Sequence, residues 1–262
     1  LENAQEWQNR PLKPFYPFVF VDCLYVSLRT ERDVQSAAVH VILAYDMDGC
    51  KDVLGLWINE VESKHAWMQS FDELKAHGLE EIGFLSMDGV TGLKDGTRAI
   101  FPQVVVQRCI VHLIRNSIRY IPRKDWGRFT KELKAIYGAL NAKQAREKFE
   151  QFQKDWASYP EALAVWQNNF THVEQLFSYG SAVRKIMYTT NAIESVNSSF
   201  RKVTKKGSFP NEDAVFKLLY LRVQELYQKW AGRTIMNWAL VRNQLLMDAR
   251  MAKLIERYDT VC

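Results

Sequence analysis

The feature that most constrains the fold is a series of three apolar segments near the start of the chain. Residues 18–28, 37–45 and 51–59 are rich in β-branched and aromatic residues, a composition that favours strands. The segment Asp46-Met-Asp-Gly49 separates the second from the third, and Asp-Gly pairs are typical of tight hairpin turns. We therefore predict three successive strands, of which the third is antiparallel to the second.

Helices and strands alternate after these three segments. Ser63 can cap a helix that runs to about His77, and an apolar strand over 82–87 ends at Asp88-Gly89. A helix over 91–100, a strand over 103–108 and a helix over 109–120 follow. Three strands followed by such alternation predict an α/β fold, with a mixed five-stranded sheet flanked by helices.

The stretch from about residue 122 to residue 187 carries helical patterns and no strand pattern. Helical runs at about 124–138, 141–157 and 160–178 predict an all-helical insertion, and more helices are expected over 188–205, 211–229 and 232–257. The predicted organisation is a linker over 1–16, a core in two parts over 17–121 and 188–230, the helical insertion over 122–187 and a C-terminal helix over 231–262.

Charge and cysteine usage narrow the classes of partner and compartment. The net charge is +5, and two clusters of basic residues are compatible with a phosphate-bearing partner, although solvated basic faces are common. The clusters are Arg115, Arg119, Arg123, Lys124 and Arg128, and Arg201, Lys202, Lys205 and Lys206. The four cysteines (Cys23, Cys50, Cys109 and Cys262) show no paired spacing, which favours a reducing compartment. The apolar run from Phe15 to Val26 is too short to span a bilayer and contains Asp22.

The segment from Tyr188 to Lys205 predicts an amphipathic helix. Ile193, Val196, Phe200 and Val203 follow the spacing of a buried stripe, and Asn191, Glu194, Asn197, Ser198, Arg201 and Lys205 are assigned to the opposite face. Thr189 or Thr190 can cap its start, and Gly207 can end it. A single carboxylate among amides and cations suits a metal ligand beside a polyanion. A solvated helix face with an ordinary Glu is the alternative.

Two aspartates in the predicted sheet are candidate partners for Glu194. Asp22 interrupts an apolar strand, where a charge is costly unless it is paired, metal-bound or hydrogen-bonded to the backbone. Asp88 ends a strand, where open α/β sheets place their sites, although an Asp-Gly turn explains it equally well. Together the three carboxylates form the oxygen-donor set that two-metal phosphoryl transfer requires.

Several segments extend this hypothesis to a known family. They are Val21-Asp-Cys-Leu-Tyr-Val26, Val53-Leu-Gly-Leu-Trp57, Met87-Asp-Gly-Val-Thr-Gly-Leu93, Phe101 to Asn116, Tyr188 to Lys205 and Gly207-Ser-Phe-Pro210. In these segments the chain resembles the Mutator-like transposase family of bacterial insertion sequences. The resemblance implies a ribonuclease H-like core whose helical insertion precedes the catalytic Glu.

The resemblance also implies an activity. A DNA transposase of this kind cleaves the ends of an insertion sequence hydrolytically and then joins them to target DNA, by direct attack of a 3′-hydroxyl on phosphorus. Asp22, Asp88 and Glu194 match the catalytic and metal-binding trio, with Mg²⁺ as the cofactor and Mn²⁺ as a substitute. A domesticated or truncated relative that binds DNA without catalysis is the alternative, and a general ribonuclease H-like nuclease explains fewer of the matching segments. The residues after Asp88 depart from the Gly-Leu-Lys-Gly that is more frequent in the family, and Lys94 lies close enough in sequence to substitute for its lysine.

Further residues are assigned roles, Cys109 and His112 by the resemblance and the others by their chemistry and spacing. Cys109 and His112 match a Cys-x-x-His signature, with Cys109 expected in the core and His112 expected to be catalytic, by contacting phosphate or orienting a ligand; a structural His is the alternative. Zinc is not favoured, because no second pair of ligands has suitable spacing. Trp166 is a candidate for stacking on an unpaired base, although core packing is the more common use of Trp. The candidate DNA contacts are Arg115, Arg119, Arg123, Asn191, Arg201, Lys202, Lys205 and Trp166.

The expected partners and location follow from this activity. They are double-stranded DNA, including terminal inverted repeats and target DNA, and at least one further copy of the chain, because two DNA ends must be paired. We expect a cytoplasmic, nucleoid-associated bacterial protein without a membrane segment. Because the sequence begins at Leu1, an N-terminal DNA-binding region is expected outside it.

Overall fold

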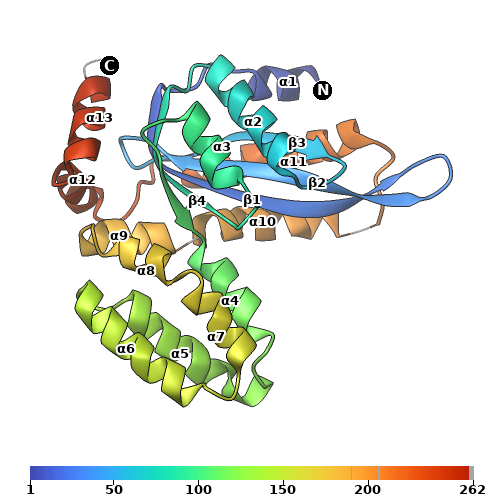
Figure 1. The fold of residues 1–262 in the computed structure, drawn as a ribbon. Coiled ribbons are helices and arrows are strands. Elements are labelled where there is room, and N and C mark those ends of the chain that lie inside the picture. Colours follow the sequence, from blue (N-terminus) through green and yellow to red (C-terminus); the bar gives the residue numbers. More distant parts are fainter. Residues whose placement is uncertain (190, 206, 260–262) are drawn as a thin grey trace. The chain divides into compact units, whose positions relative to one another are not determined.

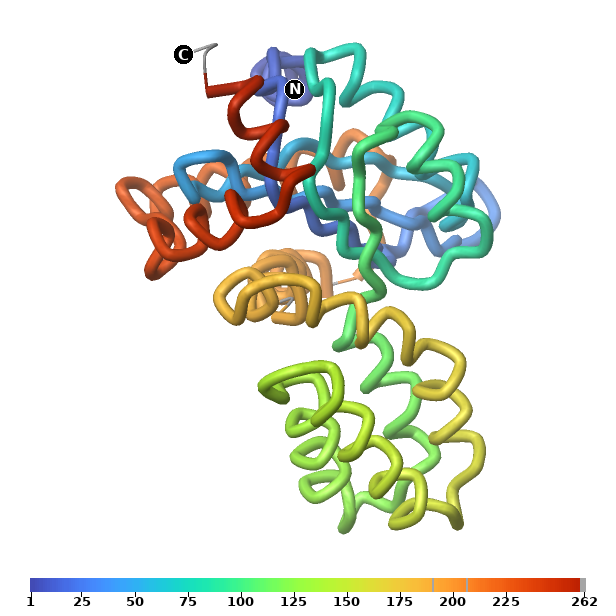
Figure 2. The backbone as a smooth tube through the Cα atoms, turned by 60° about the vertical axis from the view of Figure 1, so that its left-hand side comes forward, coloured from blue at the N-terminus to red at the C-terminus, as the bar shows by residue number. Residues whose placement is uncertain are grey.

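The computed structural model describes residues 1–189, 191–205 and 207–259. Thr190, Lys206 and Cys262, which figure in the predictions above, lie outside the described residues. The chain forms two compact units. The first comprises residues 1–106, 191–239 and 249–262, and the second comprises residues 107–190 and 240–248. Figure 2 shows the chain leaving the sheet in green, forming the helical unit and returning in orange.

A mixed five-stranded sheet organises the first unit, as predicted. Its strands are β1 (Phe15–Arg29), β2 (Val34–Tyr45), β3 (Lys51–Asn59), β4 (Glu81–Met87) and β5 (Val105–Arg108), in the order β3-β2-β1-β4-β5. The central strand β1 pairs antiparallel with β2 and parallel with β4, and β3 is antiparallel to β2. The two strand directions therefore meet at β1, the strand that carries Asp22.

Helices α2 (Lys64–Ala76) and α3 (Leu93–Ile100) pack on one face of this sheet (Figure 1). Val19 and Val21 of β1 share a buried apolar cluster with Trp67 of α2 and with other residues of both helices. Ser63 Oγ accepts a hydrogen bond from the backbone N–H of Ala66 at 3.1 Å, which confirms the predicted cap. Because successive strand residues alternate between faces, Phe20 and Asp22 lie on the face opposite to Val19 and Val21.

That opposite face is covered by α10 (Asn191–Thr204) and α11 (Glu212–Trp230). Helix α10 contacts β1 and β2, and α11 contacts α10 and β3. The predicted stripe of α10 is confirmed for Ile193, Val196 and Phe200, which are each no more than 3% exposed, whereas its fourth member, Val203, is only half-buried. Asn197 corrects the prediction, because its side chain is fully buried rather than on the exposed face.

The N-terminal segment is a structured part of the first unit rather than a linker over residues 1–16. It contains α1 (Glu2–Gln8), in which Ala4 and Trp7 are buried, and it runs into β1 at Phe15. The Gln8 amide exchanges two hydrogen bonds with the backbone of Leu56, at 2.9 and 3.1 Å. Leu56 lies in β3, an edge strand of the sheet, whose unpaired backbone groups need partners.

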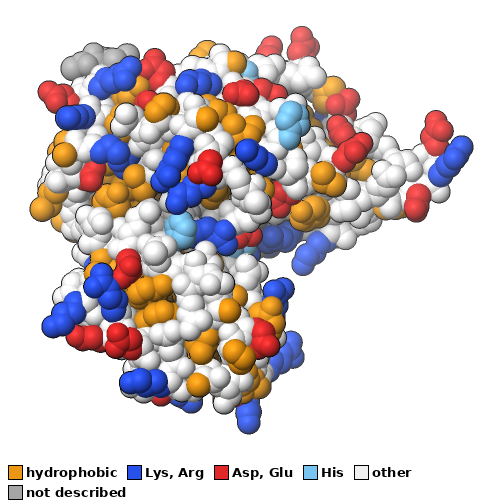
Figure 3. Space-filling model, in the orientation of Figure 1, with side chains coloured by type: hydrophobic (Ala, Val, Ile, Leu, Met, Phe, Trp, Pro, Cys, Tyr) orange, Lys and Arg blue, Asp and Glu red, His pale blue; other side chains and the backbone are white. Residues whose placement is uncertain are grey.

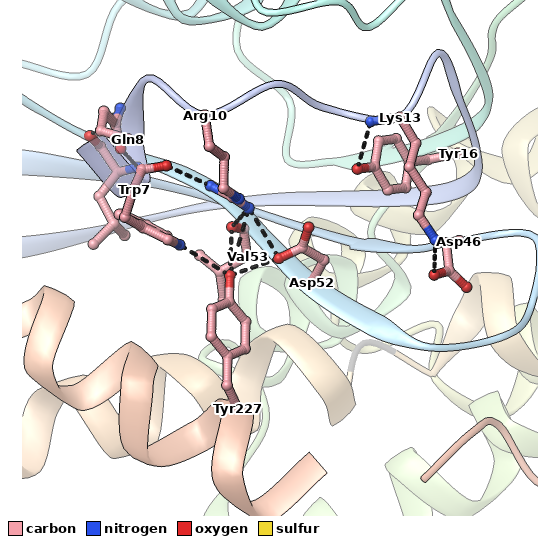
Figure 4. A network of polar contacts seen from close by, with 10 residues as sticks. Trp7, Gln8, Arg10, Lys13, Tyr16, Asp46, Asp52, Val53 and Tyr227 are labelled. Atoms are coloured by element: carbon pink, nitrogen blue, oxygen red, sulfur yellow. Dashed lines mark hydrogen bonds and ion pairs between the residues drawn. The ribbon is translucent and has the colours of Figure 1, made fainter. Parts of the chain in front are cut away.

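A polar network joins this segment to β3 and α11 (Figure 4). Arg10 Nη2 donates to Asp52 Oδ1 at 2.9 Å, and Tyr227 Oη donates to the same oxygen at 2.6 Å. Trp7 Nε1 in turn donates to Tyr227 Oη at 3.1 Å. Burial, followed by the charge of Asp52, raises the pKa of Tyr227 well above its usual range, so this hydroxyl stays a donor. The N-terminal segment is thus anchored by buried side chains and hydrogen bonds that link residues far apart in the sequence.

Apart from the end of β5 at Gln107 and Arg108 and the connecting turns, the described residues of the second unit are helical. The unit contains the stretch 122–187 that was predicted to be helical, and it extends beyond that stretch on both sides. The helices are α4 (Ile110–Ile118), α5 (Trp126–Tyr137), α6 (Ala142–Asp155), α7 (Pro160–Gln167), α8 (Phe170–Leu176) and α9 (Ser181–Tyr188), with a 3₁₀ turn at Arg123–Asp125. The helix predicted over 160–178 is two helices, because Asn168 and Asn169 interrupt it. The single C-terminal helix predicted after residue 231 is also two, α12 (Trp238–Leu246) and α13 (Ala249–Asp259). None of the described helices combines the length and apolar content that crossing a bilayer requires.

Candidate active site

The sheet brings Asp22 and Asp88 next to each other. The parallel register of β1 and β4 pairs Phe20 with Ser86, and each aspartate follows its member of this pair by two residues. Paired residues of adjacent strands lie about 5 Å apart and share a face of the sheet. Both side chains are half-buried. Continuing this register by two residues predicts that the two carboxylates lie side by side, on the face that α10 covers.

Hydrogen bonds orient both carboxylates. Asp22 Oδ1 accepts from the backbone N–H of Cys23 at 2.9 Å, and Asp88 Oδ1 accepts from that of Gly89 at 2.7 Å. Backbone hydrogen bonding was the alternative reading of Asp22, and an Asp-Gly turn was the alternative reading of Asp88; these two hydrogen bonds are compatible with both. The backbone amides of Cys23 and Gly89 each fix one oxygen of a carboxylate. They do not explain why both carboxylates occur at this point of the sheet.

Asn197 connects the catalytic candidates of the sheet to α10. Its Nδ2 donates to Asp22 Oδ2 at 2.5 Å, and Asn197 is fully buried. The orientation of the amide follows from chemistry, because an ionised carboxylate only accepts hydrogen bonds. Glu194 precedes Asn197 by three residues and is therefore its neighbour on the same side of the helix, one turn away. This contact brings half-buried Glu194 to the part of the sheet that carries Asp22.

A second contact fixes the segment that follows α10. The backbone N–H of Phe209 donates to Ser27 O at 2.8 Å, and the N–H of Arg29 donates to Phe209 O at 2.7 Å. Arg29 Nε also donates to Ser208 Oγ at 2.8 Å. Gly207, with a φ of +93°, adopts the left-handed conformation between the helix and this pairing. The strand that carries Asp22 thus holds α10 at Asn197 and holds the chain again beyond its end.

The donor chemistry around Asp22 suits a hard divalent ion. The three carboxylates supply oxygen ligands, and Asn197 Oδ1 is a further buried oxygen that has no hydrogen-bond partner among the described residues. Among those same residues, no group of three or more His, Cys, Asp or Glu side chains is arranged so that it could hold a metal ion. Metal binding by Asp22, Asp88 and Glu194 therefore stays a prediction. The structure places Asp22 in β1, Asp88 directly after β4, and Glu194 in α10, the helix that packs against β1.

Cys23 lies beside Asp22 but points to the other face of the sheet. Burial raises the pKa of the Cys23 thiol far above its usual range, and the charges of Glu62 and Asp22 add to the effect. The thiol therefore stays protonated, and neither nucleophilic nor metal-binding chemistry is expected of it, since both require the thiolate.

The basic residues predicted to contact DNA occur in both units. In the first unit, Lys202 of α10 is exposed, as is Lys205 directly after the helix; Arg201 is half-buried, and Asn191 is exposed at the helix start. In the second unit, Arg115, Arg119 and Arg123 are exposed on α4 and on the turns that follow it. Figure 3 shows Lys and Arg side chains on the visible surface of both units. Exposure is compatible with phosphate contacts, which stay a prediction.

The remaining predicted residues lie in the helical unit. Cys109 is 4% exposed and immediately precedes α4, which confirms the prediction of a core position. His112 is half-buried in the first turn of α4, and its predicted catalytic role stays open. Trp166 is corrected, because its side chain is 1% exposed and its Nε1 donates to Ser117 Oγ at 2.9 Å. A ring in that position fills the core and presents no free face to a DNA base.

Comparisons with known proteins agree with the family resemblance of the sequence motifs. A profile described as "Transposase, Mutator family" matches residues 1–232. The chain is 40% identical over 247 residues to a probable transposase for the insertion sequence element ISRM3-like of Sinorhizobium fredii, which covers 93% of this chain and 62% of the relative. It is 34% identical over 236 residues to a probable transposase for an insertion sequence element of Corynebacterium diphtheriae, covering 89% of this chain and 69% of the relative.

More distant similarities extend the same pattern. The transposase for IS256 in transposon Tn4001 of Staphylococcus aureus is 30% identical over 232 residues, covering 87% of this chain and 59% of the relative. A solved chain from the simian T-cell lymphotropic virus intasome in complex with the PP2A regulatory subunit B56 gamma covers 60% of this chain and 50% of that chain, with a TM-score of 0.26 and 13% identity, which is too low to assign a fold. The chain spans 62% of the length of the ISRM3-like relative. On the profile match and these identities, the chain belongs to the Mutator family of transposases.

Proposed function

We propose that this chain is the catalytic domain of a DNA transposase with a ribonuclease H-like core. The observation that supports the proposal is that Asn197, one helical turn after Glu194, donates to Asp22 of β1, next to the strand that Asp88 follows, in a chain of the Mutator family. The mixed strand order β3-β2-β1-β4-β5, with a helical insertion before the Glu194 helix, supports the fold assignment.

The proposed reaction is an in-line displacement at phosphorus, performed twice. In the first step a water oxygen forms a bond to phosphorus, the bond from phosphorus to the 3′ oxygen breaks, and the element end is left with a 3′-hydroxyl. In the second step that 3′ oxygen attacks a target phosphodiester, and the target's own 3′ oxygen leaves. The proton of each attacking hydroxyl passes to solvent. No covalent bond to the protein is required, in keeping with the absence of a reactive thiolate at Cys23.

Asp22, Asp88 and Glu194 would hold Mg²⁺, with Mn²⁺ as a substitute. When bound, such ions offset the charge on the attacking and leaving oxygens of a phosphoryl transfer. Asn197 holds the Asp22 carboxylate in one orientation, and the backbone amide of Gly89 does the same for Asp88. Glu194 has a long, rotatable side chain on an anchored helix, so its carboxylate can close on the aspartate pair.

The site acts on DNA in this proposal, and the basic side chains of α10 supply the nearest charge complementarity. Lys202 is exposed on the same helix as Glu194, Lys205 is exposed directly after that helix, and both suit non-specific contacts to phosphate. Pairing of two element ends requires at least two copies of the protein, so we propose a dimer or a larger assembly on DNA.

The test is a nicking assay. The chain within its full-length protein is incubated with DNA that carries the element's terminal repeats and with Mg²⁺ or Mn²⁺. We expect nicks at the element ends, and we expect a Glu194→Gln variant to lose them. Glu212→Gln, an exposed residue in the first turn of α11, is the matched control. Normal nicking by Glu194→Gln would remove Glu194 from catalysis, and DNA binding without nicking by the wild type would favour the DNA-binding regulator instead.

A further inference from the structure

The helical unit contains an open hollow between α4 and α7, and the roles predicted for single residues do not account for it. Its volume is about 530 Å³, within the range of roughly 300–1,000 Å³ that is usual for ligand sites. Its lining is mostly polar, whereas sites for drug-like molecules are mostly apolar. The polar residues of the lining are Arg108, Asn116, Arg119, Tyr120, Glu161, Asn168 and Asn169.

An arginine and a tyrosine in this lining stack on each other. The guanidinium of Arg119 lies over the ring of Tyr120, with Cζ 4.9 Å from the ring centroid, and Arg119 Nη2 donates to Tyr120 Oη at 2.9 Å. Tyr120 is 39% exposed, and Arg119 is exposed as well. Aromatic rings and guanidinium planes are the surfaces on which proteins stack unpaired nucleic-acid bases. Arg108 adds a second guanidinium to the lining, and a guanidinium can bind phosphate.

Amide and carboxylate groups complete the recognition chemistry. Asn116 and Asn168 each offer donors and an acceptor; one N–H of the Asn169 Nδ2 is bonded to Val165 O at 2.8 Å, so its other N–H and its Oδ1 remain as groups suited to a ligand. Glu161 offers acceptor oxygens, which suit the exocyclic amino group of a cytosine or an adenine. Thymine has no such amino group.

The two walls of the hollow are fixed to each other in advance. Trp166 Nε1 of α7 donates to Ser117 Oγ of α4, and Ser117 Oγ donates back to Leu113 O at 2.9 Å. Ser117 is fully buried, and Leu113 also lines the hollow. A site whose walls are already held loses less conformational entropy on binding than one that must assemble. The buried position of Trp166 thus supports the hollow from behind.

We propose that this hollow binds a single unpaired nucleotide of a DNA strand. The base stacks on the Arg119–Tyr120 surface, the amides and Glu161 contact its edge, and Arg108 and Arg119 contact the flanking phosphate. A base with an exocyclic amino group is preferred to thymine. This inference rests on DNA being the substrate, as proposed above, but the hollow belongs to the helical unit and does not include the carboxylate trio.

The test measures binding without cleavage. A Glu194→Gln background is titrated with a fully paired DNA duplex and with the same duplex that carries one extrahelical 2-aminopurine, and both affinity and 2-aminopurine fluorescence are followed. We expect tighter binding of the extrahelical duplex, with quenched fluorescence. Tyr120→Ala should weaken binding of that duplex by about 5- to 150-fold, the range typical of one stacked base, and should leave the paired duplex nearly unchanged. Tyr25→Ala, at a tyrosine that is 60% exposed outside the hollow, is the matched control.

A second arm does not depend on the folding of Tyr120→Ala. Extrahelical cytosine and thymine are compared with the unaltered hollow and with Glu161→Gln, at an exposed position. We expect cytosine to bind more tightly, and the preference to shrink in Glu161→Gln. Equal affinity for paired and extrahelical duplexes would overturn the inference while leaving the proposed function intact. Selective binding of the extrahelical base by a protein that never nicks DNA would support the hollow and refute the proposed catalysis.

Discussion

Replacing Asn197 by Ala tests whether one buried amide orients the catalytic carboxylate. The Asn197 side chain is fully buried, and its Nδ2 lies 2.5 Å from Asp22 Oδ2. A hydrogen bond to a charged group contributes about 1.5–3 kcal/mol. The variant should lose that amount of unfolding free energy, plus a smaller amount for the void left by the amide. The fold should persist, because Phe209 still pairs with β1 beyond the end of α10.

The same substitution should affect catalysis more than binding. If the bond holds Asp22 for the reaction, its loss lowers the rate of nicking by about 10- to 150-fold, which is the same free energy expressed as a rate ratio. Binding of DNA should change little, because Asn197 is buried and contacts no partner at the surface. The assays are urea unfolding and nicking with full-length protein, with Ser198→Ala, an exposed neighbour on α10, as the control.

Asn197→Asp separates orientation from loss of volume. It places a second carboxylate where the amide donated, and two carboxylates at that distance cannot both stay ionised, so the pKa of one is raised above its unfolded value. A group whose folded pKa is raised contributes stability below its unfolded pKa, near 4, and loses it as pH rises through the folded pKa. The deficit of Asn197→Asp should therefore grow between acidic and neutral pH. Stabilities and nicking rates for both Asn197 variants equal to those of Ser198→Ala would refute the reasoning.

Two further predictions concern the first unit. Tyr227→Phe removes the hydroxyl that donates to Asp52 at 2.6 Å, so it should lower the free energy of unfolding in urea by about 1.5–3 kcal/mol. Tyr220→Phe, on the same helix, should lower it much less, and equal losses in the two variants would show that the network does not stabilise the fold. Burial lowers the pKa of His40 from 6.5 to about 4. Below pH 6.5 the unfolded state therefore binds a proton that the folded state does not. The free energy of unfolding should fall by up to about 3 kcal/mol between pH 6.5 and pH 4. His40→Gln should flatten that part of the stability profile and His65→Gln, at an exposed position, should not; identical profiles in both variants would assign the acid sensitivity to other groups.

The strands could be predicted from the sequence because their signal is local. Residues 51–59 form β3 with the predicted bounds, and the other four strands differ from their predictions by a few residues at the ends. The strand order is not a local property. The adjacency of Asp22 and Asp88 depends on the parallel pairing of β1 with β4, which joins residues more than 60 positions apart, and no composition or periodicity specifies that pairing.

The structure of the N-terminal segment also could not be predicted from its local sequence. Polar composition and Pro11 and Pro14 indicate a linker, yet Ala4 and Trp7 are buried. The ring of Trp7 packs against Phe216 and Tyr220 of α11, more than 200 residues away. A short helix whose only apolar partners are that distant carries little evidence of its structure in its own sequence.

Asn197 was misassigned for a different reason, and its correction bears on the proposed mechanism. It follows Ile193 by four residues and precedes Phe200 by three, so the helical period alone puts it on the buried stripe; only its polar chemistry argued for the exposed face. A polar side chain at a buried position of a helix is costly unless it has a partner. The cost of burying this amide is offset by the Asp22 carboxylate, which is itself costly on the sheet without a partner. Each group thus offsets the cost of burying the other. An apolar stripe can slide along its contact surface, but a hydrogen bond 2.5 Å long cannot. The pair therefore fixes the helix of Glu194 to the strand of Asp22 more specifically than apolar packing could.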